Sequence, residues 1–302
     1  MKTDWLSWGA VLALSIIWGG SFALIEVALA AGEPAALAFA RAALALIVLA
    51  GFAVLTGQGF PKTRSHWVWS GAIGITSLAL PFTLIFWAQQ SLPSSVMAVI
   101  IATIPLFVLL NTRIFLKDPI RPRQWVGFTI GVAGLIAVIG VDAVAGMFEA
   151  PPLPQLAALG AAMSYGITGV IVRKGPAIAP VPATAASFVV ACVLLAPFGA
   201  ASLAVALPSA PPSALIALVV LGVLQTGLAQ LLRYWTVRRA GPVFMSTTSY
   251  LIPVWAGLFG VVFLSEYPTF EALTGFALIL AGLFIAQNKP QAARAASASN
   301  AG

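Results

Sequence analysis

Charged residues are scarce in this sequence. Of its 302 residues only 8% are Asp, Glu, Lys or Arg, whereas 61% are hydrophobic. Soluble domains carry about 25% charged residues, so this chain lacks the charge to cover a globule in water. The scarcity excludes a soluble protein and indicates an integral membrane protein. The net charge of +7 does not indicate nucleic-acid binding, because the basic residues form no cluster on a soluble face.

Residues that carry chemistry are scarce as well. The chain has one cysteine, Cys192, and one histidine, His66, which excludes a disulfide framework and a Cys/His metal site. The sequence has no phosphate-binding loop, no dinucleotide-binding glycine motif and no Ser, His and Asp set for hydrolysis. We therefore expect no catalytic residues, no metal and no cofactor. A membrane-embedded enzyme stays an alternative, and it would need a catalytic dyad or metal ligands within the bilayer.

Long apolar runs, in contrast, are abundant. A helix needs about 20 apolar residues to cross the bilayer, and these runs are too uniformly apolar for the alternation of a porin-type barrel. The sequence predicts an all-α integral membrane protein with ten transmembrane helices and short connections. The predicted spans are 6–28, 35–56, 67–90, 94–115, 122–141, 154–173, 182–206, 212–235, 241–263 and 268–287.

The Lys and Arg residues fall in alternate connections between these spans, which predicts the orientation. The connections of the other set carry carboxylates and neither Lys nor Arg. Both termini are therefore expected in the cytoplasm, in an inner membrane of the bacterial type, with 289–302 as a disordered cytoplasmic tail. The inner segments hold Lys2, Lys62, Arg64, Arg113, Lys117, Arg121, Arg123, Arg173, Lys174, Arg238, Arg239, Lys289 and Arg294.

The sequence repeats itself at an offset of 148 residues. The matched pairs are Gly74 and Gly222, Trp87 and Trp235, Met97 and Met245, Pro105 and Pro253, Phe115 and Phe263, Gly127 and Gly275, Phe128 and Phe276, and Gly134 and Gly282. The pattern divides the chain into two five-helix units, 1–146 and 147–288. Because five is odd, the second unit must be inverted relative to the first, and inverted-topology repeats are the architecture of alternating-access transporters.

Several segments resemble a known family. SIIWGGSFALIEVAL, LAFARAALAL, PLFVLL and the long run LIPVWAGLFGVVFLSEYPTFEALTGFALILAGLFI are similar to the two units of an EamA-type carrier of the drug/metabolite transporter superfamily. The resemblance extends from about Leu6 to Ala286, and it is strongest at Pro253, Glu266, Gly275 and Gly282. It implies a ten-helix bundle that exports small metabolites, commonly amino acids, and it is greatest for the aromatic amino-acid exporters.

Aromatic and neutral polar residues inside the predicted spans are candidates for lining a substrate cavity. Buried Trp and Tyr tips need hydrogen-bond partners, and amides deep in a membrane need polar neighbours. The same side chains can instead pack helices together, and both interpretations stay open. The candidate substrate-binding residues are Trp18, Ser21, Phe82, Phe86, Tyr165, Thr168, Gln225, Gln230, Tyr250 and Trp255.

The repeated prolines Pro105 and Pro253 are candidates for a hinge or gate. Each lacks an N–H and frees the carbonyl four residues earlier, at Ile101 and Ser249. In lipid a freed carbonyl must be satisfied by protein or by a water-filled cavity. A fixed kink that serves packing alone is the alternative.

Charge inside the spans is almost absent. Glu26 and Arg41 are expected to form a structural charge pair, although Arg41 can alternatively face the cavity and attract a substrate carboxylate. No Asp or Glu lies at mid-membrane, which favours facilitated uniport without a coupled ion. The sequence thus predicts an exporter of amino acids, with an efflux carrier for lipophilic cations or drugs as the alternative. Its expected partners are a small-molecule substrate and the lipid bilayer, and we expect a monomer rather than a homodimer.

Overall fold

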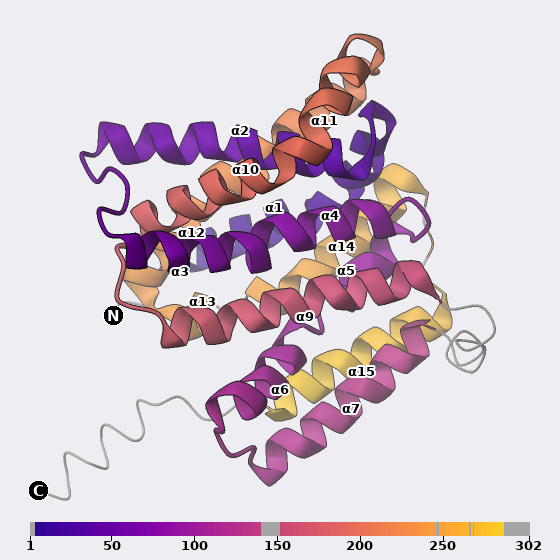
Figure 1. Cartoon of the computed structure of the whole chain (residues 1–302). Helices are drawn as coiled ribbons and strands as arrows, with labels where there is room; N and C mark the ends of the chain where they lie inside the picture. Colours follow the sequence, from indigo (N-terminus) through magenta and orange to yellow (C-terminus); the bar gives the residue numbers. More distant parts are fainter. Residues whose placement is uncertain (1–3, 140–151, 246–247, 266, 268, 287–302) are drawn as a thin grey trace, which may run out of the picture.

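The computed structural model describes residues 4–139, 152–245, 248–265, 267 and 269–286, and all regular structure in these ranges is helical (Figure 1). The first unit contains α1 Trp5–Ala28, η1 Leu29–Ala31, α2 Pro34–Leu55, α3 Arg64–Gly74, η2 Ile75–Ala79, α4 Leu80–Ala88, α5 Ser94–Ile101, α6 Ile104–Leu116 and α7 Pro122–Ile139. The second contains α9 Leu153–Lys174, α10 Pro180–Ala206, η4 Leu207–Ser209, α11 Pro212–Val219, η5 Val220–Leu228, α12 Ala229–Ala240, α13 Pro242–Met245, α14 Thr248–Leu264 and α15 Phe270–Ala286.

These helices make the chain a multi-pass membrane protein. Seven helical segments are long and apolar enough to cross a bilayer, and two shorter apolar helices follow them. Each of the ten predicted runs is mostly helical where it is described, and the run 94–115 is interrupted between Ile101 and Ile104. The all-α class is confirmed. The seven segments are Trp5–Ala31, Pro34–Leu55, Arg64–Ala88, Ser94–Leu116, Leu153–Lys174, Pro180–Ser209 and Pro212–Ala240, and the shorter helices are Leu251–Leu264 and Phe270–Ala286.

Two π-helical turns, η2 and η5, interrupt equivalent spans of the two units. Shifting η2 by the repeat offset places it within η5. In η2 the turn precedes Pro81, whose ring cannot accept the ordinary helical spacing. In η5 the corresponding residue is Ala229, and the hydroxyl of Thr226 donates to the carbonyl of Leu221 at 2.7 Å. The second π-turn therefore persists without a proline, supported by a side chain.

Each unit packs its first helix against the other unit. A Cβ on Gly19 in α1 would lie 2.5 Å from the Cβ of Trp255 in α14. A Cβ on Gly166 in α9 would lie 2.8 Å from the Cβ of Phe107 in α6. Phe107 and Trp255 are separated by the repeat offset. The two first helices thus use glycine in the same way to approach equivalent helices of the opposite unit.

The second and third spans cross between the units in the same manner. Gly74 of α3 lies against the backbone of Ser187 in α10, and Gly222 of η5 lies against the side chain of Leu44 and the carbonyl of Arg41 in α2. The two equivalent glycines thus let the third span of each unit approach the second span of the other. At the offset of 148 residues, the counterpart of Arg41 is Val189.

Helices α7 and α15 meet in a reciprocal contact. Gly127 lies against Gly282, and Gly134 lies against Gly275, so the early position on each helix meets the late position on the other. The two helices are therefore antiparallel, and positions one repeat apart exchange roles. Reciprocity of this kind is the mark of a two-fold relationship between two like surfaces.

Two ion pairs among the described residues join the units at their loop ends. Asp4, which caps α1, pairs with Arg239 at the end of α12, and Asp118 after α6 pairs with Arg173 at the end of α9. The α2–α3, α6–α7 and α9–α10 connections lie at the end of the bundle where the chain begins, on the left of Figure 1. The Arg239 guanidinium holds the pKa of the Asp4 carboxyl well below its usual value.

Candidate functional site

A buried arginine lies where helices of both units meet. Arg41 of α2 is only 7% exposed, and its Nε donates to the hydroxyl of Thr226 in η5 at 3.0 Å. Its guanidinium carbon lies 4.3 Å from the ring centroid of Phe82 in α4, a cation–π distance. Tyr165 of α9 is near enough to interact electrostatically with it. We call Arg41, Phe82, Tyr165 and Thr226 the arginine cluster.

The neighbour of Thr226 extends this cluster toward α1. The indole N–H of Trp18 donates to the backbone carbonyl of Gln225 at 3.1 Å, which supplies a partner for one carbonyl of the π-turn. The Oε1 atom of Gln225 is buried and accepts no hydrogen bond from any described group. The structure therefore brings Trp18, Phe82, Tyr165 and Gln225, four of the predicted substrate-binding residues, around Arg41 and Thr226.

The described contacts of Arg41 are with a neutral hydroxyl and an aromatic face. The expected charge pair of Glu26 with Arg41 stays a prediction. The η5 turn accounts for the contact between Arg41 and Thr226. Gly222 lets α2 approach η5 closely, and Thr226 follows one turn later on the same element.

A second polar contact lies at the equivalent place in the other half. Ser164 of α9 donates to the carbonyl of Thr76 in η2 at 2.7 Å, and the hydroxyls of Thr168 and Thr76 are 2.8 Å apart. Like Trp18, these side chains belong to the first helix of one unit and contact the π-turn of the other. The predicted residue Thr168 thus lies in a neutral contact with Thr76.

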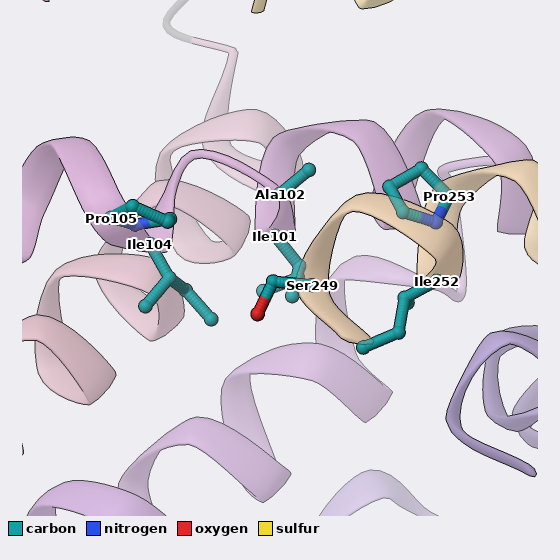
Figure 2. A pocket seen from close by; sticks show the side chains of 7 residues that line it. All are labelled: Ile101, Ala102, Ile104, Pro105, Ser249, Ile252 and Pro253. Atoms are coloured by element: carbon teal, nitrogen blue, oxygen red, sulfur yellow. The ribbon is translucent and has the colours of Figure 1, made fainter. Parts of the chain in front are cut away.

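The two repeated prolines face the same small cavity. Its volume is about 80 Å³, and Figure 2 shows Pro105 and Pro253 on either side with Ser249 between them. Ile101 and Ser249, whose carbonyls the prolines leave without their helical partners, also line it. Ligand pockets usually measure about 300–1,000 Å³, so this cavity is too small for an amino acid in the present conformation.

The remaining predicted residues are dispersed. Ser21 and Phe86 are buried, and Phe86 belongs to the main hydrophobic core. Gln230 accepts a hydrogen bond from Arg233 at a half-buried site. The indole of Trp255 donates to Ser15 at 3.1 Å, and the side chain of Tyr250 lies outside the described residues.

The sequence did not predict one buried polar residue, Gln89. Gln89 is only 2% exposed, its amide donates to the carbonyl of Phe22 at 3.0 Å, and its Oε1 accepts no hydrogen bond among the described groups. It stands near the end of a predicted span, beside Gln90. An amide pair at a span end looks like an interfacial feature, so only its burial distinguishes Gln89.

Comparison with known families agrees with this architecture. The model of the EamA-like transporter family matches residues 6–140 and again residues 153–287. The two matches cover most of the chain and fall one in each half. The chain belongs to the EamA-like transporter family, within the drug/metabolite transporter superfamily.

Individual proteins that are similar to this chain bear the names of transporters. A probable terminal-alkyne amino-acid exporter of Streptantibioticus cattleyicolor is 26% identical over 94% of both chains. The uncharacterized inner membrane transporter YedA of Escherichia coli is 37% identical over 130 residues, so the chain spans 42% of that relative's length. One solved crystal structure, at 22% identity, superposes with a TM-score of 0.63 over 92% of this chain and 95% of the other, which supports the fold.

Proposed function

We propose that this protein is a secondary transporter with ten transmembrane helices in two inverted five-helix units, 1–146 and 147–288. The observation that carries the proposal is the antiparallel, reciprocal contact of α7 with α15. A parallel repeat would bring equivalent positions of these helices together in the same direction. Inversion gives two similar arrangements of one bundle, open to opposite sides, which is the basis of alternating access.

Charge supports the orientation with both termini in the cytoplasm. The described connections at the end of the bundle where the chain begins carry the Lys and Arg residues, and those at the other end carry Glu33. Positive residues favour the cytoplasmic side. In this orientation the Asp4–Arg239 and Asp118–Arg173 pairs join the two units on the cytoplasmic side.

We propose amino acids, especially aromatic and other neutral ones, as the exported substrates. One relative that covers 94% of the chain bears the name of an amino-acid exporter. The arginine cluster joins one buried cation to the aromatic rings of Phe82 and Tyr165. Alternating access here is facilitated, since the described mid-membrane segments contain no carboxylate for a proton relay.

Pro105 and Pro253 are the proposed hinge. Both line the cavity between α5, α6 and α14, where freed carbonyls can change partners at little cost. The chain works as a monomer in this proposal. Gly127 and Gly131, spaced like a helix-dimer motif, pack inside the chain against Gly282 and Leu106.

Uptake by purified protein in liposomes tests the proposed function. Labelled phenylalanine, tryptophan, threonine, alanine and one charged amino acid are compared with a quaternary cation. We expect saturable uptake of the neutral amino acids without a proton gradient, fastest for the aromatic pair. Uptake of the cation alone would establish the drug-efflux alternative, and uptake that requires a proton gradient would overturn the facilitated mechanism.

A further inference from the structure

Within the proposed function, on which this inference rests, we propose that Arg41 is the anchor for the substrate's carboxylate. Arg41 is a buried residue in a chain that has very few intramembrane charges. A cation in such a place is functional by default when it has no fixed counter-ion. Arg41 forms no ion pair with a described residue.

The contacts of Arg41 orient its guanidinium without using most of its donors. A guanidinium carries five N–H donors, and the Nε donor goes to Thr226. Thr226 gives its own proton to the carbonyl of Leu221, so its hydroxyl oxygen is left to accept from Arg41. The two terminal nitrogens make no hydrogen bond with the residues that the structure describes. They form the edge that suits a bidentate carboxylate.

Spare hydrogen-bonding capacity one residue from Thr226, the partner of Arg41, matches the rest of an amino acid. Gln225 precedes Thr226, is 95% buried, and has an Oε1 acceptor without a described partner. A zwitterionic amino acid offers a carboxylate for the spare donors of Arg41 and an ammonium group for the spare acceptor of Gln225. The ring of Phe82 beside the guanidinium suits a flat or apolar side chain. The ligand class is therefore a neutral α-amino acid with a free carboxylate.

The repeat indicates one such anchor among the residues that the structure describes. Val189, which cannot bind a carboxylate through its side chain, occupies the position equivalent to Arg41. The equivalent of Thr226 is Leu78. One buried cation in one half gives a single carboxylate site near the junction of the units, and its occupancy would alternate with the opening of each side.

The test measures discrimination between phenylalanine and phenylalaninamide, which differ in the free carboxylate. Uptake of each is measured in liposomes for wild type, Arg41→Gln and Arg41→Lys. We expect Arg41→Gln to raise the half-saturation concentration for phenylalanine by about tenfold to a hundredfold, the cost of one lost charge-assisted contact. The amide, which cannot use the anchor, changes little, and Arg41→Lys lies between wild type and Arg41→Gln.

Arg233→Gln is the matched control. Arg233 lies in the same helical segment as Thr226 but is exposed, and it bonds to Gln230 outside the arginine cluster. Its transport should equal that of wild type for both compounds. If Arg41→Gln folds and slows both compounds equally, the role of Arg41 is structural and the proposal is overturned.

Two further results separate the possible failures. If Arg41→Gln does not fold, Thr226→Val replaces it, because that change loosens the guanidinium and keeps its charge. Selective weakening for phenylalanine supports the anchor, and equal weakening for both compounds overturns it. If wild type transports no amino acid at all, the proposed function fails, and this result is distinct from transport that ignores Arg41.

Discussion

The two copies of the repeated proline have the same sequence spacing and different conformations. In the first copy, α5 ends at Ile101 and α6 begins at Ile104, with Pro105 in its first turn. In the second copy, α14 is continuous from Thr248 to Leu264, and Pro253 lies inside it. Both prolines line one cavity. The chain thus holds one proline at a helix break and the equivalent proline inside a continuous helix, around the same space.

The difference shows that the proline permits a break and that its surroundings decide whether one forms. In the first copy the N–H of Leu106 bonds to the carbonyl of Thr103, and the Thr103 hydroxyl bonds to Ile100, which closes the interruption locally. The residue equivalent to Thr103 is Leu251, which has no hydroxyl for such a closure. The two halves of an inverted repeat must differ in conformation for the bundle to open to one side at a time.

The largest effect is expected where the two copies are held together. Gly134→Leu places a side chain against the backbone of α15 at Gly275, where even a Cβ would lie 2.5 Å from the carbonyl oxygen. Because neither backbone can retreat, we expect loss of folded protein, measured as the monodisperse fraction after detergent extraction. Gly257→Leu is the control, since a Cβ there meets nothing within 4 Å. Equal yields would contradict the tight contact of α7 with α15.

Replacing each proline tests the comparison directly. Pro105→Ala restores an N–H donor and lets α5 and α6 join, so the first copy comes to resemble the second. We expect the transport rate to fall about tenfold, a barrier increase of ~1.4 kcal/mol, and Pro253→Ala to have a smaller effect because α14 is already continuous. Pro197, exposed inside α10, is the control, and Pro197→Ala should leave uptake unchanged. Equal effects of all three changes on the transport rate would contradict the proposed hinge.

Two hydroxyls of the second unit that lie at its junction with the first should contribute unequally to stability. Thr226→Val removes the acceptor of a buried guanidinium, which costs about 1.5–3 kcal/mol, whereas Ser187→Ala removes a bond that the helix makes to itself. Thermal unfolding in detergent should show a clear fall in midpoint for the first change and almost none for the second. A reversed order would contradict the contact between Thr226 and Arg41.

The smallest effect is expected at the ion pair between Asp4 and Arg239. Arg239 depresses the pKa of Asp4, so the stability from this pair is present above the carboxyl's ordinary pKa, near 4, and is lost as pH falls through its lower folded value. The difference in thermal midpoint between wild type and Asp4→Asn should therefore stay constant from pH 7 to pH 5 and shrink only below about pH 4. A difference that disappears by pH 6 would contradict the pair.

Much of the fold could be predicted from the sequence, because apolar run length and the repeat depend on local composition. The helical runs are where hydropathy places them, and the glycines matched by the repeat prove to be packing positions. Less of the candidate site could be predicted. The π-turn at η5 could not be predicted, because no proline lies at its end. That turn places Thr226 against Arg41. Whether Pro105 or Pro253 breaks its helix also depends on contacts that repeat spacing cannot reveal.

The pairing of Arg41 with Val189 in the repeat has a consequence for how such a bundle can carry charge. Two identical five-helix chains, inserted in opposite orientations, could make the same reciprocal contacts, but each would carry the same residue at this position. Such a pair would place two guanidinium groups in one low-dielectric core, where like charges repel strongly. With both units in one polypeptide, one copy carries a valine while the other carries the charge. Unequal copies thus make a single buried cation compatible with a two-fold bundle.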